Sequence, residues 1–323
     1  LRARGHAITF CCGPPAADAL RARGEAVVEV PAPHEVVKEN RVRLLASARR
    51  NAPLAVRTPE IVNALAERIE ALKPEGVVAD FEPFAPRAAK RLGLPCVALD
   101  HQHVLSEARC RVPLRYAPAY ALTRLGIGVM APRRLYSRIV IPTFFFPPLR
   151  RGSRARLVPP VLRADVREVQ PSEGERVLVY VNHPAGSERL LAALSEAGAP
   201  CTVYGIPAPE RIERCPNLRF APPSRGGFLR DLAAARAVVC TAGFTLISEA
   251  LHLGKPLLVL PNRGFFEQAI NALYLRQRKW GEAVIGRALR ADDLRGFLRR
   301  LPSAAPGGPT GNAEAAAAVE AAL

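Results

Sequence analysis

The sequence has few aromatic residues and no long apolar run. Aromatic side chains make up 6% of its 323 residues, with one tryptophan and one methionine. No apolar stretch approaches the roughly 20 residues that a membrane-spanning helix needs. No positively charged segment followed by an apolar stretch and a cleavage site marks a secretory signal. We therefore expect a chain that neither spans a membrane nor is secreted.

Paired cysteine motifs are also missing. The seven cysteines are scattered and form no C-x-x-C pair. This spacing disfavours a disulfide scaffold and a zinc ribbon, and it favours a reducing compartment. The sequence therefore predicts a cytoplasmic protein.

The charge is strongly one-sided, with 46 lysines and arginines against 29 acidic residues and a net charge of +17. Lysine occurs only at positions 38, 73, 90, 255 and 279, so nearly all the positive charge is arginine. Together with abundant alanine, this skew is typical of GC-rich coding. No basic stripe interleaved with aromatics is present, which disfavours nucleic acid. A nucleotide or an anionic phospholipid surface is the expected kind of partner.

Short apolar strands alternate with helices along most of the chain, which is typical of parallel sheets covered on both faces. The alternation of strands and helices is irregular from about residue 104 to 165, and a proline-rich linker is expected near 159–165. The pattern predicts an α/β protein with two Rossmann-like domains. Their expected bounds are 1–162 and 163–301, followed by a low-complexity tail at 302–323. Helices are expected over 35–50 and 59–73.

The chain starts at Leu1 without a methionine, and Arg2, Arg4 and Gly5 resemble the last turn and C-cap of a helix. We therefore expect the sequence to be truncated at its amino end.

Ligands bind outside the carboxyl ends of the strands in open parallel sheets. In the first half, these ends carry Asp80, Glu82, Asp100 and His101. In the second half, they carry polar or small residues at Asn182, Ser187, Thr241, Gly243 and Asn262. Each of them could also be an ordinary turn residue or helix cap.

The segment from Val238 to Glu249 gives the strongest signal. A strand ends in a small-residue turn that opens a helix, so the free N–H groups of Gly243, Phe244 and Thr245 favour a phosphate. Thr245 and Glu249 share one helix face. This spacing suits a nucleoside diphosphate, with Glu249 at the ribose. The alternative is an ordinary helix start and a surface glutamate.

The next strand-to-helix turn carries a second polar group. Glu267, Gln268 and Asn271 lie in the first turns of the following helix and could grip a neutral polyol. An ordinary surface helix explains each of them alone, but not the position of the turn beside the preceding one.

The run TAGFTLISEALHLGKPLLVLPNRGFFEQAINA, residues 241–272, resembles the donor-binding half of a GT-B glycosyltransferase. It is closest to glycosyltransferase family 28, which includes the N-acetylglucosaminyltransferase of peptidoglycan synthesis and a MurG-like branch. VVADFEP at 77–83, VALDHQH at 97–103 and the initial RARGHAITF agree with that branch. The resemblance covers roughly residues 2–110 and 176–300.

The resemblance implies two Rossmann-like domains facing across a cleft, with a UDP-sugar bound mainly by the second. It implies an inverting transferase that needs no metal or other cofactor, and the sequence has no acidic D-x-D pair in a suitable turn. The resemblance does not specify the acceptor, although membrane-linked and cell-envelope acceptors are common among relatives. The expected donor-binding residues are Asn182, Ser187, Thr241, Gly243, Phe244, Thr245, Ser248, Glu249, Asn262, Glu267, Gln268 and Asn271.

The family normally begins with a strand and a glycine-rich loop ending in a histidine, and this segment is missing here. The remaining candidates for the catalytic base are Asp80, Glu82, Asp100 and His101.

Two further questions stay open at the level of sequence. Tyr116, Tyr120, Leu122, Leu125 and residues 144–146 lie among arginines and could rest on an anionic membrane at its inner face, or form an interdomain core. The same fold also serves UDP-sugar 2-epimerases, nucleotide-sugar hydrolases and non-catalytic nucleotide-sugar binding proteins.

Overall fold

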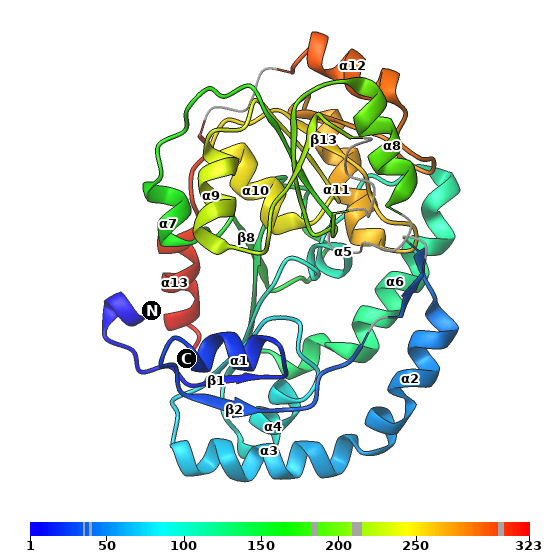
Figure 1. Ribbon diagram of the computed structural model, residues 1–323. Coiled ribbons are helices and arrows are strands. Elements are labelled where there is room, and N and C mark those ends of the chain that lie inside the picture. The colour runs from blue at the N-terminus through cyan, green and yellow to red at the C-terminus, as the bar shows by residue number, and fades with distance from the viewer. Residues whose placement is uncertain (35, 39–40, 182–186, 209–214, 303–306) are drawn as a thin grey trace.

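Parallel strands dominate the computed structural model of the chain (Figure 1). The structure describes residues 1–34, 36–38, 41–181, 187–208, 215–302 and 307–323. Short strands that alternate with helices form these sheets, which confirms the predicted α/β class.

The second half of the chain forms a six-stranded parallel sheet in the order β11-β10-β9-β12-β13-β14. Its strands are β9 (Val177–Tyr180), β10 (Cys201–Tyr204), β11 (Leu218–Phe220), β12 (Ala237–Cys240), β13 (Leu257–Val259) and β14 (Gly281–Ala283). The inner strands β9, β12 and β13 are almost wholly apolar and buried, because helices cover both faces of the sheet. Those helices are α8 (Glu188–Ala197), α9 (Arg225–Ala233), α10 (Phe244–His252), α11 (Phe266–Gln277) and α12 (Ala291–Arg299).

The strand order of this sheet reverses between β9 and β12. The chain moves outward from β9 to β10 and β11, then returns to pair β12 with the other side of β9, with Val177 opposite both Cys201 and Ala237. The carboxyl ends of β9 and β12 therefore flank a switch point, where open parallel sheets bind their ligands.

The first half contains two separate parallel sheets. A four-stranded sheet has the order β5-β6-β7-β8, with β5 (Val77–Ala79), β6 (Cys96–Leu99), β7 (Arg138–Pro142) and β8 (Ala155–Val158). A second sheet pairs β1 (Phe10–Cys12) with β2 (Val27–Glu29). Within the described ranges, no ladder joins β1 or β2 to the four-stranded sheet.

Ten helical segments lie before the second sheet in the described part of the first half and the linker. They are η1 (Arg2–Arg4), α1 (Ala16–Arg21), α2 (Leu44–Val56), α3 (Thr58–Leu72), α4 (Ala85–Leu92), α5 (Val104–Glu107), η2 (Leu114–Tyr116), α6 (Ala117–Met130), η3 (Arg133–Leu135) and α7 (Ala164–Glu168).

The helix expected over 35–50 is wrong in its first part. An antiparallel pair, β3 (Val37–Lys38) with β4 (Arg41–Val42), precedes α2. The segment from Val36 to Val42 is rich in β-branched valine, which suits a strand better than a helix. The helix expected over 59–73 is present as α3.

Aromatic rings join the two halves of the chain. Phe145, which follows β7, stacks on Tyr274 of α11 with ring centroids 4.0 Å apart. Tyr120 of α6 stacks on Phe266 at 5.3 Å. One continuous apolar cluster contains buried residues from both the four-stranded and the six-stranded sheet. The interface between the halves is therefore a packed core at this point.

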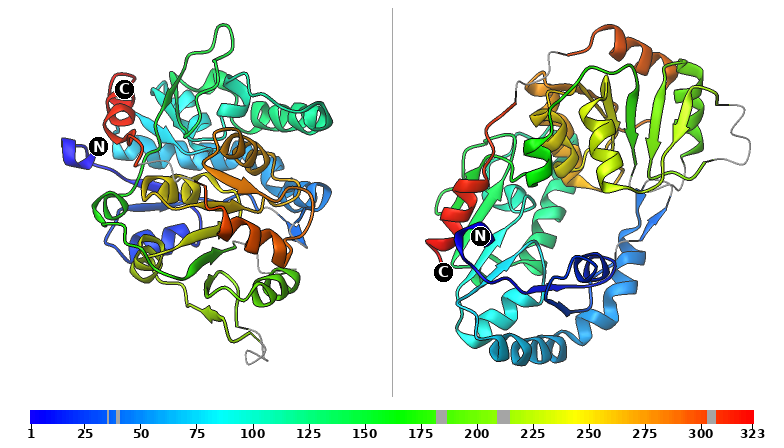
Figure 2. Two further views of the ribbon diagram at one scale, coloured as in Figure 1. Left: turned by 90° about the horizontal axis from the view of Figure 1, so that it is seen from above. Right: turned by 60° about the vertical axis from the view of Figure 1, so that its left-hand side comes forward.

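The end of the chain returns to the first half, beside the N-terminus (Figure 2). Helix α13 (Asn312–Glu320) buries Ala315, Ala318 and Val319 against the four-stranded sheet. Glu320 Oε1 lies 3.0 Å from His6 Nε2, and its other oxygen lies 2.6 Å from Arg4. The end of the low-complexity tail is therefore packed against the first half, and it contains one nine-residue helix.

Within the described residues, no helix is long and apolar enough to cross a membrane. All seven cysteines carry free thiols.

Candidate active site

Helix α10 begins at the carboxyl end of β12, beside the switch point of the six-stranded sheet. Leu246, Ile247, Ala250 and Leu251 form its buried apolar face, spaced as a helix requires. Gly254 in the left-handed conformation (φ 68°), with Pro256 soon after, ends the helix. The sequence thus fixes both the direction of α10 and the edge of the sheet at which it starts.

The start of α10 has no side-chain cap. Gly243 occupies the N-cap position in an extended conformation, and no side chain accepts a hydrogen bond there. Its own N–H, which the sequence predicted to be free, instead donates to Thr241 O at 2.7 Å. The first N–H groups of a helix have no partner inside the helix, and among the described residues the backbone N–H groups of Phe244 and Thr245 find none elsewhere. These donors and the helix dipole favour an anion.

The space around Gly243 is open. A Cβ built on this glycine would meet no atom within 4 Å apart from its chain neighbours. Its φ of −69° is also accessible to any residue. The conformation therefore does not require glycine here, whereas a close approach of a ligand to the backbone would require it.

Glu249 lies six residues into α10 and is buried, with 3% of its surface exposed. Its Oε1 accepts a hydrogen bond from Arg163 Nε at 3.0 Å. Arg163 immediately precedes α7 and extends an ion-pair network to Asp165 and on to Arg225. Among the described residues, no hydrogen bond reaches Glu249 Oε2, so one oxygen of this buried carboxylate remains available to a ligand.

The turn after β13 and the start of α11 lie next along the same edge of the sheet, because β13 pairs with β12. Gln268 Oε1 accepts a hydrogen bond from the backbone N–H of Asn262 at 2.9 Å, which fixes the turn to the helix. The Asn262 side chain is 4% exposed, and neither its oxygen nor its nitrogen has a partner within the described ranges. Buried polar groups normally have partners, so Asn262 is available to bind a ligand.

Asn271 and Glu267 lie one turn apart on α11. Asn271 is fully buried, and its Nδ2 donates to Ala242 O at 3.1 Å and to Glu267 Oε1 at 3.3 Å. Its Oδ1 lies 2.9 Å from His101 Nε2. Protein groups therefore occupy both ends of this amide, and Asn271 can affect a sugar only through Glu267, which is half-buried.

Asp80 follows β5 directly and is the most exposed of the four acid–base candidates. Its side chain has solvent-exposed surface. The surrounding protein nevertheless desolvates the carboxyl, and together with the like charges of Asp100 and Glu267 this raises its pKa to about 6. The next residue, Phe81, has a positive φ of 47°, a strained conformation that occurs often at functional sites.

The other three acid–base candidates are engaged within the protein. Glu82 accepts hydrogen bonds from the backbone N–H groups of Phe84 and Ala85 at the start of α4. Asp100 is buried and accepts from the backbone and ring of His103. His101 is 4% exposed. In this structure, none of these three is placed to take a proton from an acceptor, because each is held by internal partners.

His103, which the sequence interpretation did not select, forms a buried ion pair with Asp100. Burial lowers the pKa of His103, but the hydrogen bond and charge of Asp100 outweigh it, and the pKa is raised overall. The Nδ1 to Oδ2 distance is 2.7 Å, and both side chains are 0% exposed. The sequence could have indicated this pair, because Asp100 lies three residues before His103, the spacing at which an aspartate caps the start of a helix.

The remaining predicted site residues lie at the same edge of the second sheet. Thr245 is exposed in the first turn of α10, and Thr241 is buried in the turn that precedes this helix. Ser248 is 2% exposed, and its Oγ has no hydrogen-bond partner among the described residues. Ser187 is half-buried at the start of α8, after β9. Asn182 lies outside the described residues.

Phe244 differs from the other predicted site residues, because its ring faces the first half of the chain. It stacks on His101 with ring centroids 4.0 Å apart and an interplanar angle of 9°. Its side chain therefore belongs to the contact between the halves, while its backbone N–H belongs to the turn.

The segment that was expected either to rest on a membrane or to form an interdomain core, residues 111–146, is partly buried and partly exposed. Phe144 and Phe145 are buried in the core between the halves, as one of the two interpretations expected. Leu114, Leu122, Leu125 and Val129 are exposed by 56–90% on η2 and α6. Arg111, Arg115, Arg133 and Arg134 are exposed nearby in the sequence.

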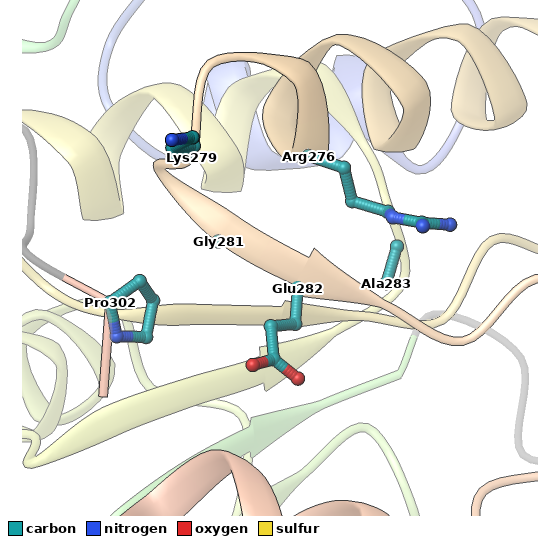
Figure 3. Close-up of a pocket in the computed structure, with 6 residues that line it drawn as sticks. All are labelled: Arg276, Lys279, Gly281, Glu282, Ala283 and Pro302. Atoms are coloured by element: carbon teal, nitrogen blue, oxygen red, sulfur yellow. The ribbon is translucent and has the colours of Figure 1, made fainter. Parts of the chain in front are cut away.

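A shallow depression of about 430 Å³ lies elsewhere, at the edge strand β14 (Figure 3). Arg276, Lys279 and Glu282 contribute its charged groups. Arg276 is nine residues beyond Glu267 on α11, roughly 14 Å along the helix axis. The depression is therefore at the opposite end of α11 from the predicted site. No cluster of three metal-ligating His, Cys, Asp or Glu side chains is found in the part of the chain that the structure describes.

Two α/β halves, with an open helix start at the switch point of the second sheet, are the arrangement found in GT-B glycosyltransferases. Residues 1–302 match the model of the family described as glycosyl transferase family 1. The chain belongs to this family, and its activity is sugar transfer.

Solved structures of GT-B glycosyltransferases have the same fold. The calicheamicin glycosyltransferase CalG4 is 21% identical, with a TM-score of 0.65 over 100% of this chain and 92% of its own. UGT2 of Phytolacca americana, complexed with UDP-2-fluoro-glucose and pterostilbene, is 16% identical, with a TM-score of 0.61 over 96% and 85%. MurG of Acinetobacter baumannii is 16% identical, with a TM-score of 0.57 over 93% and 84%. No curated protein sequence matches the chain.

Proposed function

We propose that the chain transfers a sugar from a UDP-sugar, with inversion and without a metal or other cofactor, to a lipid-linked or cell-envelope acceptor. The observation that carries this proposal is the uncapped start of α10 at the switch point, with open space over Gly243 and the buried carboxylate of Glu249 further along the same helix.

The spacing within α10 supports a nucleoside diphosphate. Six residues separate Gly243 from Glu249, a rise of about 9 Å along the helix. This length is comparable with the separation of a diphosphate from the ribose hydroxyls of the same nucleotide. We place the diphosphate against the N–H groups of Phe244 and Thr245 and the ribose hydroxyls on Glu249 Oε2.

The sugar would extend toward α11. Glu267 is the half-buried carboxylate nearest to the start of that helix, and the unpartnered amide of Asn262 and the hydroxyl of Ser248 add hydrogen-bonding groups at the same edge. These groups suit the hydroxyls of a neutral sugar. The domain bounds at 162 and 301 separate this donor-binding half from an acceptor-side half.

Asp80 is the proposed base. With a pKa of about 6, its carboxyl is largely ionised at neutral pH and still basic enough to accept a proton. The acceptor oxygen attacks the anomeric carbon while its proton passes to Asp80. The bond from that carbon to the diphosphate oxygen breaks, and its electron pair leaves with UDP. The N–H groups at the start of α10 stabilise the negative charge that develops there. A single displacement inverts the anomeric centre.

The exposed face of η2 and α6 suits a peripheral contact with an anionic membrane at its cytoplasmic side. Leucine and valine side chains lie exposed there among arginines, a combination that favours anionic lipid surfaces. Sedimentation with phosphatidylglycerol vesicles should exceed that with phosphatidylcholine vesicles. Substituting Leu122 and Leu125 by serine should reduce it. Equal sedimentation with both lipids would contradict this contact.

The decisive experiment for the activity measures UDP and sugar products from a panel of UDP-sugars, with and without lipid and cell-envelope acceptors. Acceptor-dependent UDP release supports transfer. An epimer formed without acceptor indicates a 2-epimerase, and free sugar with UDP indicates a hydrolase. Binding without any turnover indicates a non-catalytic nucleotide-sugar binding protein. Membership of the MurG-like family 28 branch stays a prediction.

A further inference from the structure

A single buried amide connects the two halves of the chain at the predicted site. Asn271 receives a hydrogen bond from His101, which follows β6 in the first half, at 2.9 Å. Its Nδ2 donates to Ala242 O, in the turn that begins α10, and to Glu267 Oε1. Because Nδ2 faces two oxygens, the orientation of the amide is fixed, and Oδ1 must face His101.

His101 itself is held on every side. Its Nδ1 lies 2.8 Å from Pro142 O at the end of β7. Its ring stacks on Phe244 at 4.0 Å and meets Phe145 edge-on at 5.6 Å. The ring is 4% exposed and cannot turn away from Asn271 without breaking these contacts. The first half therefore presents a rigid hydrogen-bond donor to the second half.

Glu267 is restrained by the same amide. It is half-buried at the second position of α11. The hydrogen bond from Asn271 Nδ2 to Glu267 Oε1 limits where this carboxylate can lie.

We propose that His101 and Asn271 are positioning residues through which the acceptor-side half of the chain sets the placement of Glu267 and of the turn at Ala242. This inference rests on the proposed function, in which the turn binds diphosphate and Glu267 contacts the donor sugar. Affinity for the sugar then depends on a residue of the opposite half that touches no part of the donor. A variant that breaks the link between His101 and Asn271 should therefore weaken the binding of the sugar more than the binding of the nucleotide.

The test compares the binding of UDP with that of UDP-glucose and UDP-N-acetylglucosamine by calorimetry. His101→Phe keeps a flat ring on Phe244 and removes the hydrogen bond to Asn271, together with the contact of Nδ1 with Pro142 O. We expect it to raise the Kd of the bound UDP-sugar about tenfold while changing the Kd of UDP less than threefold. Asn271→Ala should weaken both at least tenfold, because the Ala242 turn also loses its hydrogen bond.

Asn217→Ala is the matched control. Asn217 Nδ2 donates to Leu194 O and Ala199 O, at 3.0 and 2.8 Å, at the opposite edge of the sheet. Its loss removes two amide hydrogen bonds and should lower Tm without changing the ratio of the two Kd values. A ratio unchanged in His101→Phe as well would overturn the inference.

A second measurement needs no donor. Tm is determined for His101→Phe, Glu267→Ala and the double variant. Since Asn271 links the two side chains, their effects should be non-additive. If the unmodified chain binds neither UDP nor a UDP-sugar, the proposed function fails, whereas this cycle still decides the inference. Additive shifts would overturn it, and non-additive shifts would support the link.

Discussion

Arg163 Nε and Glu249 Oε1 lie 3.0 Å apart, although 86 positions separate them in the sequence. The carboxylate is 4% exposed, whereas the guanidinium is 37% exposed. The linker between the two sheets thus supplies the cation that compensates a buried negative charge in the predicted ribose site.

Arg163→Met should destabilise the chain because it leaves Glu249 buried without its cation. Removing one partner of a fully buried pair costs 3–5 kcal/mol, and the partial exposure of Arg163 reduces this to about 1–2 kcal/mol. Glu249→Gln in the same chain should restore most of the loss. Thermal unfolding of both single variants and the double variant checks this, and additive shifts would show that the pair is not coupled.

Asp80 should make transfer pH-dependent. A base must be ionised to accept a proton, so kcat/KM should fall as pH decreases through about 6, the raised pKa of Asp80. Asp80→Asn should lower kcat by 10²–10⁴-fold with little change in the Kd of UDP. A variant that keeps normal turnover, or a rate that is flat from pH 5 to 8, would exclude Asp80 as the base.

Gly243→Ala separates ligand contact from protein packing. The added methyl group meets no protein atom within 4 Å, and the backbone φ of −69° suits alanine. Tm should therefore change little, while UDP affinity should fall at least tenfold because the methyl group lies where the diphosphate approaches. Gly126→Ala, also in open space on α6, is the control. Unchanged UDP affinity in Gly243→Ala would place the phosphate elsewhere.

The buried pair of Asp100 and His103 should contribute stability that depends on pH. The pKa of His103 is raised above its usual value of 6.5, so the charged pair is fully formed below that pH and is lost as pH rises through the higher folded value. The Tm difference between the unmodified chain and His103→Gln should be larger at pH 6 than at pH 9. The opposite trend would mean that His103 is neutral in the fold.

The sequence predicted those features that depend on local pattern. The small-residue turn, the apolar periodicity of α10 and the position of Glu249 are all encoded within about a dozen residues. The contact of Gln268 was not predicted: the sequence assigned this side chain to the donor sugar, whereas its Oε1 accepts a hydrogen bond from the backbone N–H of Asn262, six residues earlier.

Features that depend on distant partners could not be read in this way. His101 meets Asn271 across 170 positions, and periodicity contains no information about which side chains a packed interface brings together. The polar character of Asn271 therefore indicated a ligand contact, whereas the structure shows an internal link. The β3–β4 pair was missed because a short hairpin followed by a helix resembles one longer amphipathic segment.

A calorimetric titration with UDP tests the central claim most directly. The unmodified chain should bind one UDP, and Glu249→Ala should bind it at least tenfold more weakly. Glu314→Ala, which removes a half-exposed carboxylate on α13, should bind as the unmodified chain does. If Glu249→Ala retains full affinity, or if the unmodified chain binds no UDP, α10 is not the nucleotide site and the account is wrong.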